Sequence, residues 1–183
     1  MLQASSGATG RQAAFTLLEL LAVITLIAVL AGLVLGVGRR AVESGRIARA
    51  KTELAAISVA LEAYKRTYGD YPRTDDEARL LQALIGRRGP AGAASNGRAV
   101  LELARFTTAG ALDPFSNVSA ELIDPWGQPY LYAYKVPASG WTNFGYVLYS
   151  AGPDRRNAVA LLPGGFTDNT PPENADNIHA SQN

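Results

Sequence analysis

A single carboxylate lies near the start of a long apolar run. The run extends from Phe15 to Val37, and Glu19 is its only charged residue; the next charge is Arg39. A helix needs about 20 apolar residues to cross the ~30 Å hydrocarbon core of a bilayer, and this run supplies them. A carboxylate in such a segment is costly, so Glu19 either extends to the lipid headgroups or pairs with a positive charge from a partner.

Residues that would support catalysis are scarce. His179 is the one histidine, and the sequence has no cysteine, no HExxH motif and no phosphate-binding loop. A Ser–His–Asp set is compatible with the composition, but no motif positions one. Without cysteine, disulfides and thiolate metal sites are excluded. We therefore predict that the chain is not an enzyme.

The apolar run continues into a predicted amphipathic helix that ends at about residue 68. Its apolar residues recur at steps of three and four, whereas Glu53 and most other charged residues are expected on the remaining faces. The stripe comprises Ile47, Ala50, Leu54, Ile57, Leu61, Tyr64 and Tyr68. We expect it to pack on the core of a domain, and the basic part from Arg39 to Lys51 to face headgroups or neighbouring subunits.

The remaining sequence predicts shorter elements. The residues from Thr74 to Glu77 are typical of a capping box that opens a second helix, and residues 98–105 predict a short third helix. Residues 130–136 and 144–150 are typical of strands. The predicted fold class is therefore α+β, with a long N-terminal helix packed on a small antiparallel β-sheet. The first half of that helix would be transmembrane and the second half amphipathic.

The segment from Ala14 to Leu21 resembles the class III signal of type IV pilins and type II secretion pseudopilins. The resemblance implies that a prepilin peptidase cuts between Ala14 and Phe15 and N-methylates Phe15. It also implies that Glu19 pairs with the N-terminus of a neighbouring subunit in a filament. Ala14 departs from the family pattern, which usually has Gly before the cut.

A second segment, Asp124-Pro125-Trp126-Gly127-Gln128-Pro129-Tyr130, resembles the DPWGxPY signature of the major, G-type pseudopilin of the type II secretion system. The absence of cysteine also favours the pseudopilin branch, because many type IV pilins close their C-terminal region with a disulfide. The formal charge of +1 falls to about zero without Arg11, which argues against nucleic-acid binding.

The resemblance implies an organisation in three parts and a set of partners. Residues 1–14 would be a cleaved leader, 15–38 a single-pass transmembrane and assembly helix in the bacterial inner membrane, and 39–183 a periplasmic domain with the pilin fold. Within the domain, 69–124 would form a loop region and 125–183 the sheet and C-terminal loop. Counting positive charges alone would place this domain in the cytoplasm, and the processing motif overrides that count. The implied partners are further copies in a helical filament, minor pseudopilins, the prepilin peptidase, and an inner-membrane assembly platform with a cytoplasmic ATPase.

Two interpretations of the acidic C-terminal segment are possible from its sequence. Its Gly, Pro, Asn and Asp content is typical of a disordered tail. The residues around Asp154 and Asp176 are similar to the two ends of the calcium loop of major pseudopilins. That resemblance implies calcium as a cofactor, with carboxylates from Asp154 and Asp176 and the backbone carbonyl near Ala151 as ligands.

We therefore expect a structural subunit of a pseudopilus that helps export folded proteins through a type II secretion system. Two alternatives remain open at this point: a type IV pilin of a surface filament for adhesion, motility or DNA uptake, and a monomeric membrane-anchored periplasmic domain.

Overall fold

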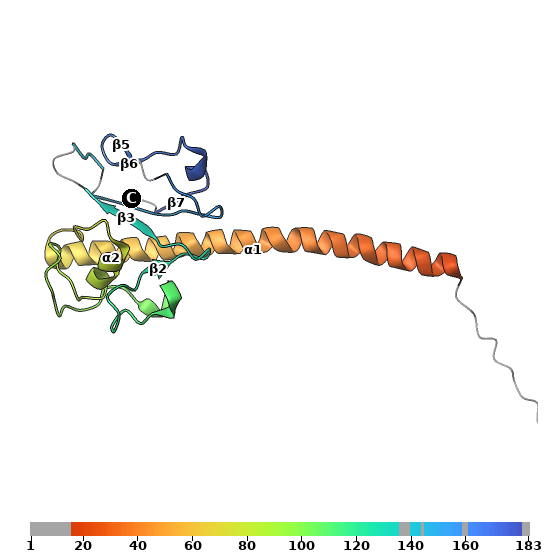
Figure 1. The fold of residues 1–183 in the computed structure, drawn as a ribbon, viewed down its shortest axis with the longest axis horizontal. Coiled ribbons are helices and arrows are strands. Elements are labelled where there is room, and N and C mark those ends of the chain that lie inside the picture. Colours follow the sequence, from red (N-terminus) through yellow and green to blue (C-terminus); the bar gives the residue numbers. More distant parts are fainter. Residues whose placement is uncertain (1–15, 136–139, 144, 159–160, 181–183) are drawn as a thin grey trace, which may run out of the picture. The chain divides into compact units, whose positions relative to one another are not determined.

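The computed structural model describes residues 16–135, 140–143, 145–158 and 161–180, with the backbone alone described at 33–37 and 39 (Figure 1). The chain divides into two compact units, Met1–Val42 and Glu43–Asn183. The described part of the first unit is helical from Leu17 onward, with exposed leucine, isoleucine and valine side chains. The second unit contains the core and every described strand.

The longest element is helix α1, Leu17–Tyr68. Its predicted apolar stripe is confirmed: Ala50, Leu54, Ile57, Leu61 and Tyr64 are almost fully buried. The basic part from Arg39 to Lys51 was expected to face headgroups or neighbouring subunits, and this is wrong for Arg49, which bonds Glu53 and Thr107 within the domain. The helix ends at Gly69, whose N–H bonds the carbonyl of Lys65 and whose φ of 84° is the left-handed conformation that glycine adopts without strain.

Helix α2, Glu77–Leu84, buries Leu80, Leu81 and Leu84. Its N-cap is Asp76, whose carboxylate accepts from the backbone N–H of Arg79, so the predicted cap at Thr74 is two residues too early. The helix predicted for residues 98–105 is also wrong, because only a 3-10 turn forms there, Leu103–Arg105. A second 3-10 turn follows at Ala109–Ala111.

The described strands form three small antiparallel sheets. Strand β1 (Thr107–Thr108) pairs with β2 (Leu122–Ile123). The main sheet has the order β3 (Leu131–Tyr134), β4 (Tyr146–Ser150) and β7 (Ile178–His179). Strand β5 (Leu161–Leu162) forms a hairpin with β6 (Phe166–Thr167), and a 3-10 turn at Pro172–Asn174 precedes β7. The α+β class is confirmed, and both predicted strands exist over shorter ranges.

The core lies where the second half of α1 meets α2 and the main sheet. In Figure 1, β3 and β7 lie beside this half of α1, and α2 packs close to both β2 and β3. Tyr146 of β4 packs between Tyr71 and Tyr132, with ring centroids 4.8 and 5.9 Å away. The Tyr132 hydroxyl donates to the carbonyl of Pro72, so the buried phenol is hydrogen-bonded as burial requires.

Among the described residues, no helix has both the length and the apolar character that a membrane crossing requires. The transmembrane segment expected at residues 15–38 therefore stays a prediction.

Candidate functional site

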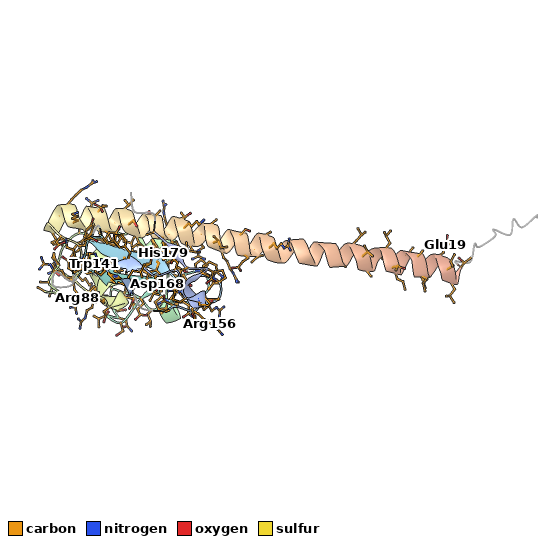
Figure 2. All side chains as sticks on the ribbon, turned by 90° about the horizontal axis from the view of Figure 1, so that it is seen from above. Glu19, Arg88, Trp141, Arg156, Asp168 and His179 are labelled. Atoms are coloured by element: carbon orange, nitrogen blue, oxygen red, sulfur yellow. The ribbon has the colours of Figure 1, made fainter. Side chains whose placement is uncertain are left out.

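Glu19 lies in the first turn of α1, where its side chain is exposed (Figure 2). Its carboxylate accepts from the backbone N–H and the hydroxyl of Thr16, both at 3.5 Å, and its own N–H donates to the Thr16 hydroxyl at 3.2 Å. This reciprocal pattern is a capping box. The positive end of the helix dipole also stabilises a carboxylate at this position. Glu19 therefore caps α1 through long hydrogen bonds. Ala14 and Phe15, the predicted processing residues, lie outside the described part of the chain.

The turn at residues 124–130 is built around one buried carboxylate. Asp124 Oδ1 accepts from the backbone N–H groups of Trp126 and Gln128 at 3.0 and 2.9 Å. Its Oδ2 accepts from the hydroxyl of Ser150, on β4, at 2.6 Å. Asp124 is 3% exposed, so these three donors replace the water that the charge would otherwise require. Asp124 thus fixes the turn and ties it to the main sheet.

The same turn is anchored to α1 by two glutamates. The indole Nε1 of Trp126 donates to Glu43 at 2.9 Å, and the hydroxyl of Tyr130 donates to Glu53. Burial, followed by the hydrogen bond to Glu53, raises the pKa of Tyr130, so its hydroxyl stays protonated as a donor.

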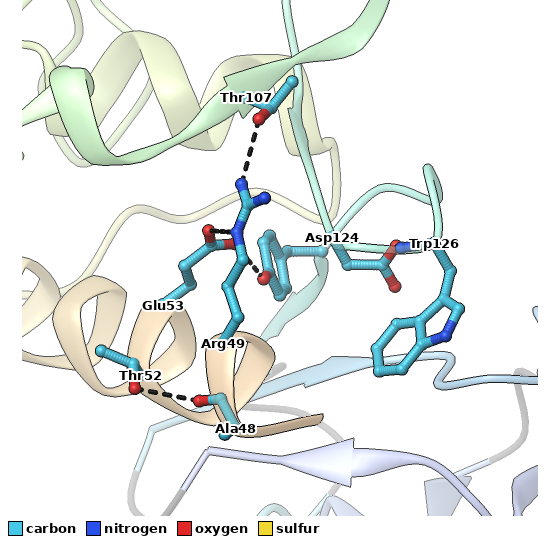
Figure 3. A network of polar contacts seen from close by, with 8 residues as sticks. Ala48, Arg49, Thr52, Glu53, Thr107, Asp124 and Trp126 are labelled. Carbon is cyan, nitrogen blue, oxygen red and sulfur yellow. Dashed lines mark hydrogen bonds and ion pairs between the residues drawn. The ribbon is translucent and has the colours of Figure 1, made fainter. Parts of the chain in front are cut away.

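The second partner of Glu53 is Arg49, whose Nε lies 2.6 Å from its carboxylate (Figure 3). Arg49 also donates to the hydroxyl of Thr107 on β1 at 3.1 Å. Glu53 is only 5% exposed, yet its charge is matched by a cation and a hydroxyl. This network joins α1, β1 and the 124–130 turn.

Successive short contacts connect the turn at 124–130 to the C-terminal loop. The Ser150 hydroxyl that donates to Asp124 also accepts from the N–H of Gly152 at 3.1 Å. Gly152 has a φ of 71°, and a Cβ on it would lie 2.3 Å from the carbonyl oxygen of Asp176. Only glycine permits this close approach. The C-terminal segment is therefore held at Gly152 and Asp176, and its strand β7 pairs with β4 in the main sheet, so the interpretation as a disordered tail is wrong for these residues.

The structure brings the two predicted calcium residues together. The backbone N–H of Asp154 donates to Asp176 Oδ2 at 2.8 Å, across 22 positions of sequence, while the Asp154 carboxylate accepts from the N–H of Arg156. Ala151, which precedes Gly152 in the sequence, is buried. Asp176 Oδ1 and Asn177 Oδ1 are buried without a hydrogen-bond partner among the described residues. No group of three or more His, Asp and Glu side chains placed to hold a metal occurs in this described part.

His179 makes packing and hydrogen-bond contacts within the fold. Its ring lies 5.5 Å from that of Tyr149, and Nε2 is 3.1 Å from Asn169 Oδ1. Burial lowers the pKa of His179, which favours its neutral form. These contacts join β7 to β4 and to the loop after β6.

Sequence reasoning missed the roles of Asp124, Ser150 and Glu53. Glu53 was expected outside the apolar stripe, but it lies three residues after Ala50 and four before Ile57, which is the spacing of the stripe itself. Asp followed by Pro-x-Gly is common at the first position of a turn, so the sequence position of Asp124 indicates its role in the turn. Ser150 had none, because its partner lies 26 residues away.

Two protein-family models match the sequence. Residues 39–160 match the family described as "Type II secretion system (T2SS), protein G", which is well over half of the sequence. The chain belongs to the protein G family. Residues 9–35 match the "Prokaryotic N-terminal methylation motif". Comparison with curated proteins and with solved structures gave no significant match.

Membership of the protein G family confirms the resemblance stated from the sequence. The family is one of structural pseudopilins, and its methylation motif is a substrate site for a peptidase. The α+β fold with an N-terminal helix on small antiparallel sheets is consistent with the pilin fold. In this protein G chain, the matched range includes the turn at 124–130 and the glutamates that hold it.

The buried carboxylate of Asp124 predicts a stability effect. Asp124→Ala leaves the N–H groups of Trp126 and Gln128 and the Ser150 hydroxyl without their acceptor. Each unsatisfied buried group costs about 1–3 kcal/mol, so we expect the free energy of unfolding to fall by about 3 kcal/mol after partial relaxation. Urea denaturation of a fragment comprising Glu43–Asn183 measures it.

Asp113 supplies the matched control. It accepts from the N–H of Phe115 in a similar turn but is exposed, so Asp113→Ala should lower the free energy of unfolding far less than Asp124→Ala does. Equal losses from the two variants would contradict the role assigned to Asp124.

Proposed function

We propose that this protein is a structural subunit of a pseudopilus that helps export folded proteins through a type II secretion system. The match of residues 39–160 to the protein G family carries the proposal, and the methylation motif at 9–35 supports it. The proposed partners are minor pseudopilins, a prepilin peptidase, and an inner-membrane platform driven by a cytoplasmic ATPase. The work of the chain is mechanical, since assembly turns membrane-held monomers into a rod.

In this proposal residues 15–38 cross the inner membrane and the domain from residue 39 is periplasmic. Between Leu17 and Leu30 the large apolar side chains of α1 are all exposed in the monomer, by 46% or more. Such a surface suits lipid before assembly and other copies of the same helix afterwards. Packing of these helices would form the centre of a helical filament.

Proteolytic processing of the leader gives a prediction of its own. If a prepilin peptidase recognises this leader, the mature chain begins at N-methyl-Phe15, because the methylation motif spans both sides of the bond after Ala14. Intact-mass measurement of the chain purified from membranes checks this. Retention of Met1, or a cut beyond Val37, would contradict it.

Glu19 has two separable roles in the proposal. In the monomer its carboxylate caps α1 through Thr16. In the filament the carboxylate would pair with the amine of a neighbour's Phe15, and such a charge-assisted contact is stronger in an apolar environment than in water. The exposure of Glu19 and its long capping bonds support this availability.

Two variants separate the roles. Glu19→Gln keeps a side chain that serves in a capping box but removes the charge, whereas Glu19→Ala removes both. We expect both variants to insert into the membrane at normal levels and both to lose filament assembly, measured by sedimentation of sheared filaments. Normal filament yield from Glu19→Gln would show that capping alone explains this residue.

We also propose that the C-terminal loop binds calcium. Asp154 and Asp176 would supply carboxylate oxygens and Ala151 its backbone carbonyl. The unpartnered buried oxygens of Asp176 and Asn177 support a cation here, because calcium accepts amide and backbone oxygens beside carboxylates. Calcium would screen the negative charge of the loop and hold it against β4.

Calcium should therefore raise the melting temperature of the Glu43–Asn183 fragment relative to chelator. Binding to the folded state alone stabilises by about 2.7 kcal/mol at a hundredfold excess over Kd. Asp154→Ala or Asp176→Ala should abolish the increment, and magnesium should fail to reproduce it because it demands tighter octahedral geometry. Asp168→Ala, outside the proposed ligand set, is the control. A wild-type melting temperature indifferent to calcium would reject the site.

A further inference from the structure

A shallow apolar hollow lies along one flank of the second half of α1. Its floor includes Ala56 and Val59, and its wall is the segment of Val100 and Phe106. The volume is about 320 Å³, and an adjoining hollow of about 250 Å³ extends past Phe106 toward Arg49. Val59 is 70% exposed within it. Single exposed valines are ordinary, but a valine framed by a second apolar wall is suited to receive an apolar side chain.

The β5–β6 hairpin carries matching apolar side chains. Leu162 and Phe166 face each other across the two strands, and they are 44% and 46% exposed. A tight turn at Gly164 and Gly165 joins the strands, both with positive φ, and Thr142 and Asn143 donate their N–H groups to the carbonyl of Gly164. These hydrogen bonds hold the turn of the hairpin in place, and the hairpin presents an exposed apolar surface.

Charge distinguishes the two surfaces. Residues 161–180, which include the hairpin, carry three acidic residues and no lysine or arginine. Residues 87–105, which lead into the wall of the hollow, carry four arginines against one glutamate, Glu102. Arg98 and Arg105 are exposed on either side of Val100. Opposite charges around apolar patches favour association of these two surfaces and set its orientation.

The two surfaces cannot meet within one chain. In Figure 1 the β5–β6 hairpin lies on one side of the second half of α1, and the green segment that follows residue 100 lies on the other. A contact between them must therefore join two copies, through different surfaces on each. Such a heterologous contact leaves a free hollow and a free hairpin at the ends, so it extends into an open chain unless the rotation closes a ring.

We infer that the β5–β6 hairpin of one copy docks into the Val59–Phe106 hollow of a second copy of this chain. Phe166 and Leu162 fill the hollow, and the acidic segment 161–180 faces the arginines of segment 87–105. This inference rests on the proposed filament function and adds a specific contact between globular domains to it. It predicts that assembly depends on salt even where the apolar helices are unchanged.

The cysteine-free sequence allows a direct test in the full chain, in the membranes of cells that assemble it. The double variant Val59→Cys with Phe166→Cys is oxidised mildly, and immunoblots follow the products. Docking predicts a ladder of dimers, trimers and longer products, fainter at high salt. Each single variant should stay monomeric, because the docking brings Val59 of one copy to Phe166 of another. It does not bring the same position of two copies together.

The control pair is Val59→Cys with Val118→Cys. Val118 is 64% exposed and lies on a different loop, so it matches Phe166 in access but not in position. No ladder from the Val59–Phe166 pair, or an equal ladder from the control pair, overturns the docking. Filaments of the wild-type chain, counted separately by immunogold electron microscopy, report on the proposed function itself. Filaments without the ladder reject the docking alone, whereas absence of filaments rejects the filament function.

Discussion

Two buried carboxylates hold the globular unit together. Glu53 of α1 binds Tyr130 and Arg49, and Asp124 binds the backbone of its own turn and Ser150 of β4. A buried charge without partners costs several kcal/mol, so these groups are favourable only when the turn, the helix and the sheet are all in place. The apolar stripe of α1 supplies the driving force for packing, and the carboxylates select one arrangement of the small sheets upon it.

Helix α1 therefore has two kinds of surface along one continuous sequence. Its first half exposes large apolar residues and carries Glu19 as a capping carboxylate. Its second half buries the stripe from Ala50 to Tyr64 and positions Glu53 inside the domain. In this protein G family member, the exposed apolar residues of the first half of α1 are therefore separate from those that build the globular core. Substitutions in either half should then affect different steps.

Much of this was accessible from the sequence because it rests on local periodicity. The helix, its stripe and its end at Gly69 follow from spacing, as does the α+β class. The N-cap of α2 and the 3-10 turn at Leu103–Arg105 were mispredicted because several polar residues compete as caps and tertiary contacts override weak helix propensity. The Ser150–Asp124 and Gly152–Asp176 contacts join positions more than 20 residues apart. Such pairs depend on the completed fold, and no local pattern encodes them.

The measurement that bears most directly on the pseudopilus account is protein export after deletion of the chain. Periplasmic and culture fractions of the deletion strain are compared with those of a strain that carries the gene back. The account predicts that folded exported proteins accumulate in the periplasm and return to the medium on complementation. Unchanged export together with loss of long surface fibres would contradict it and favour a surface pilin.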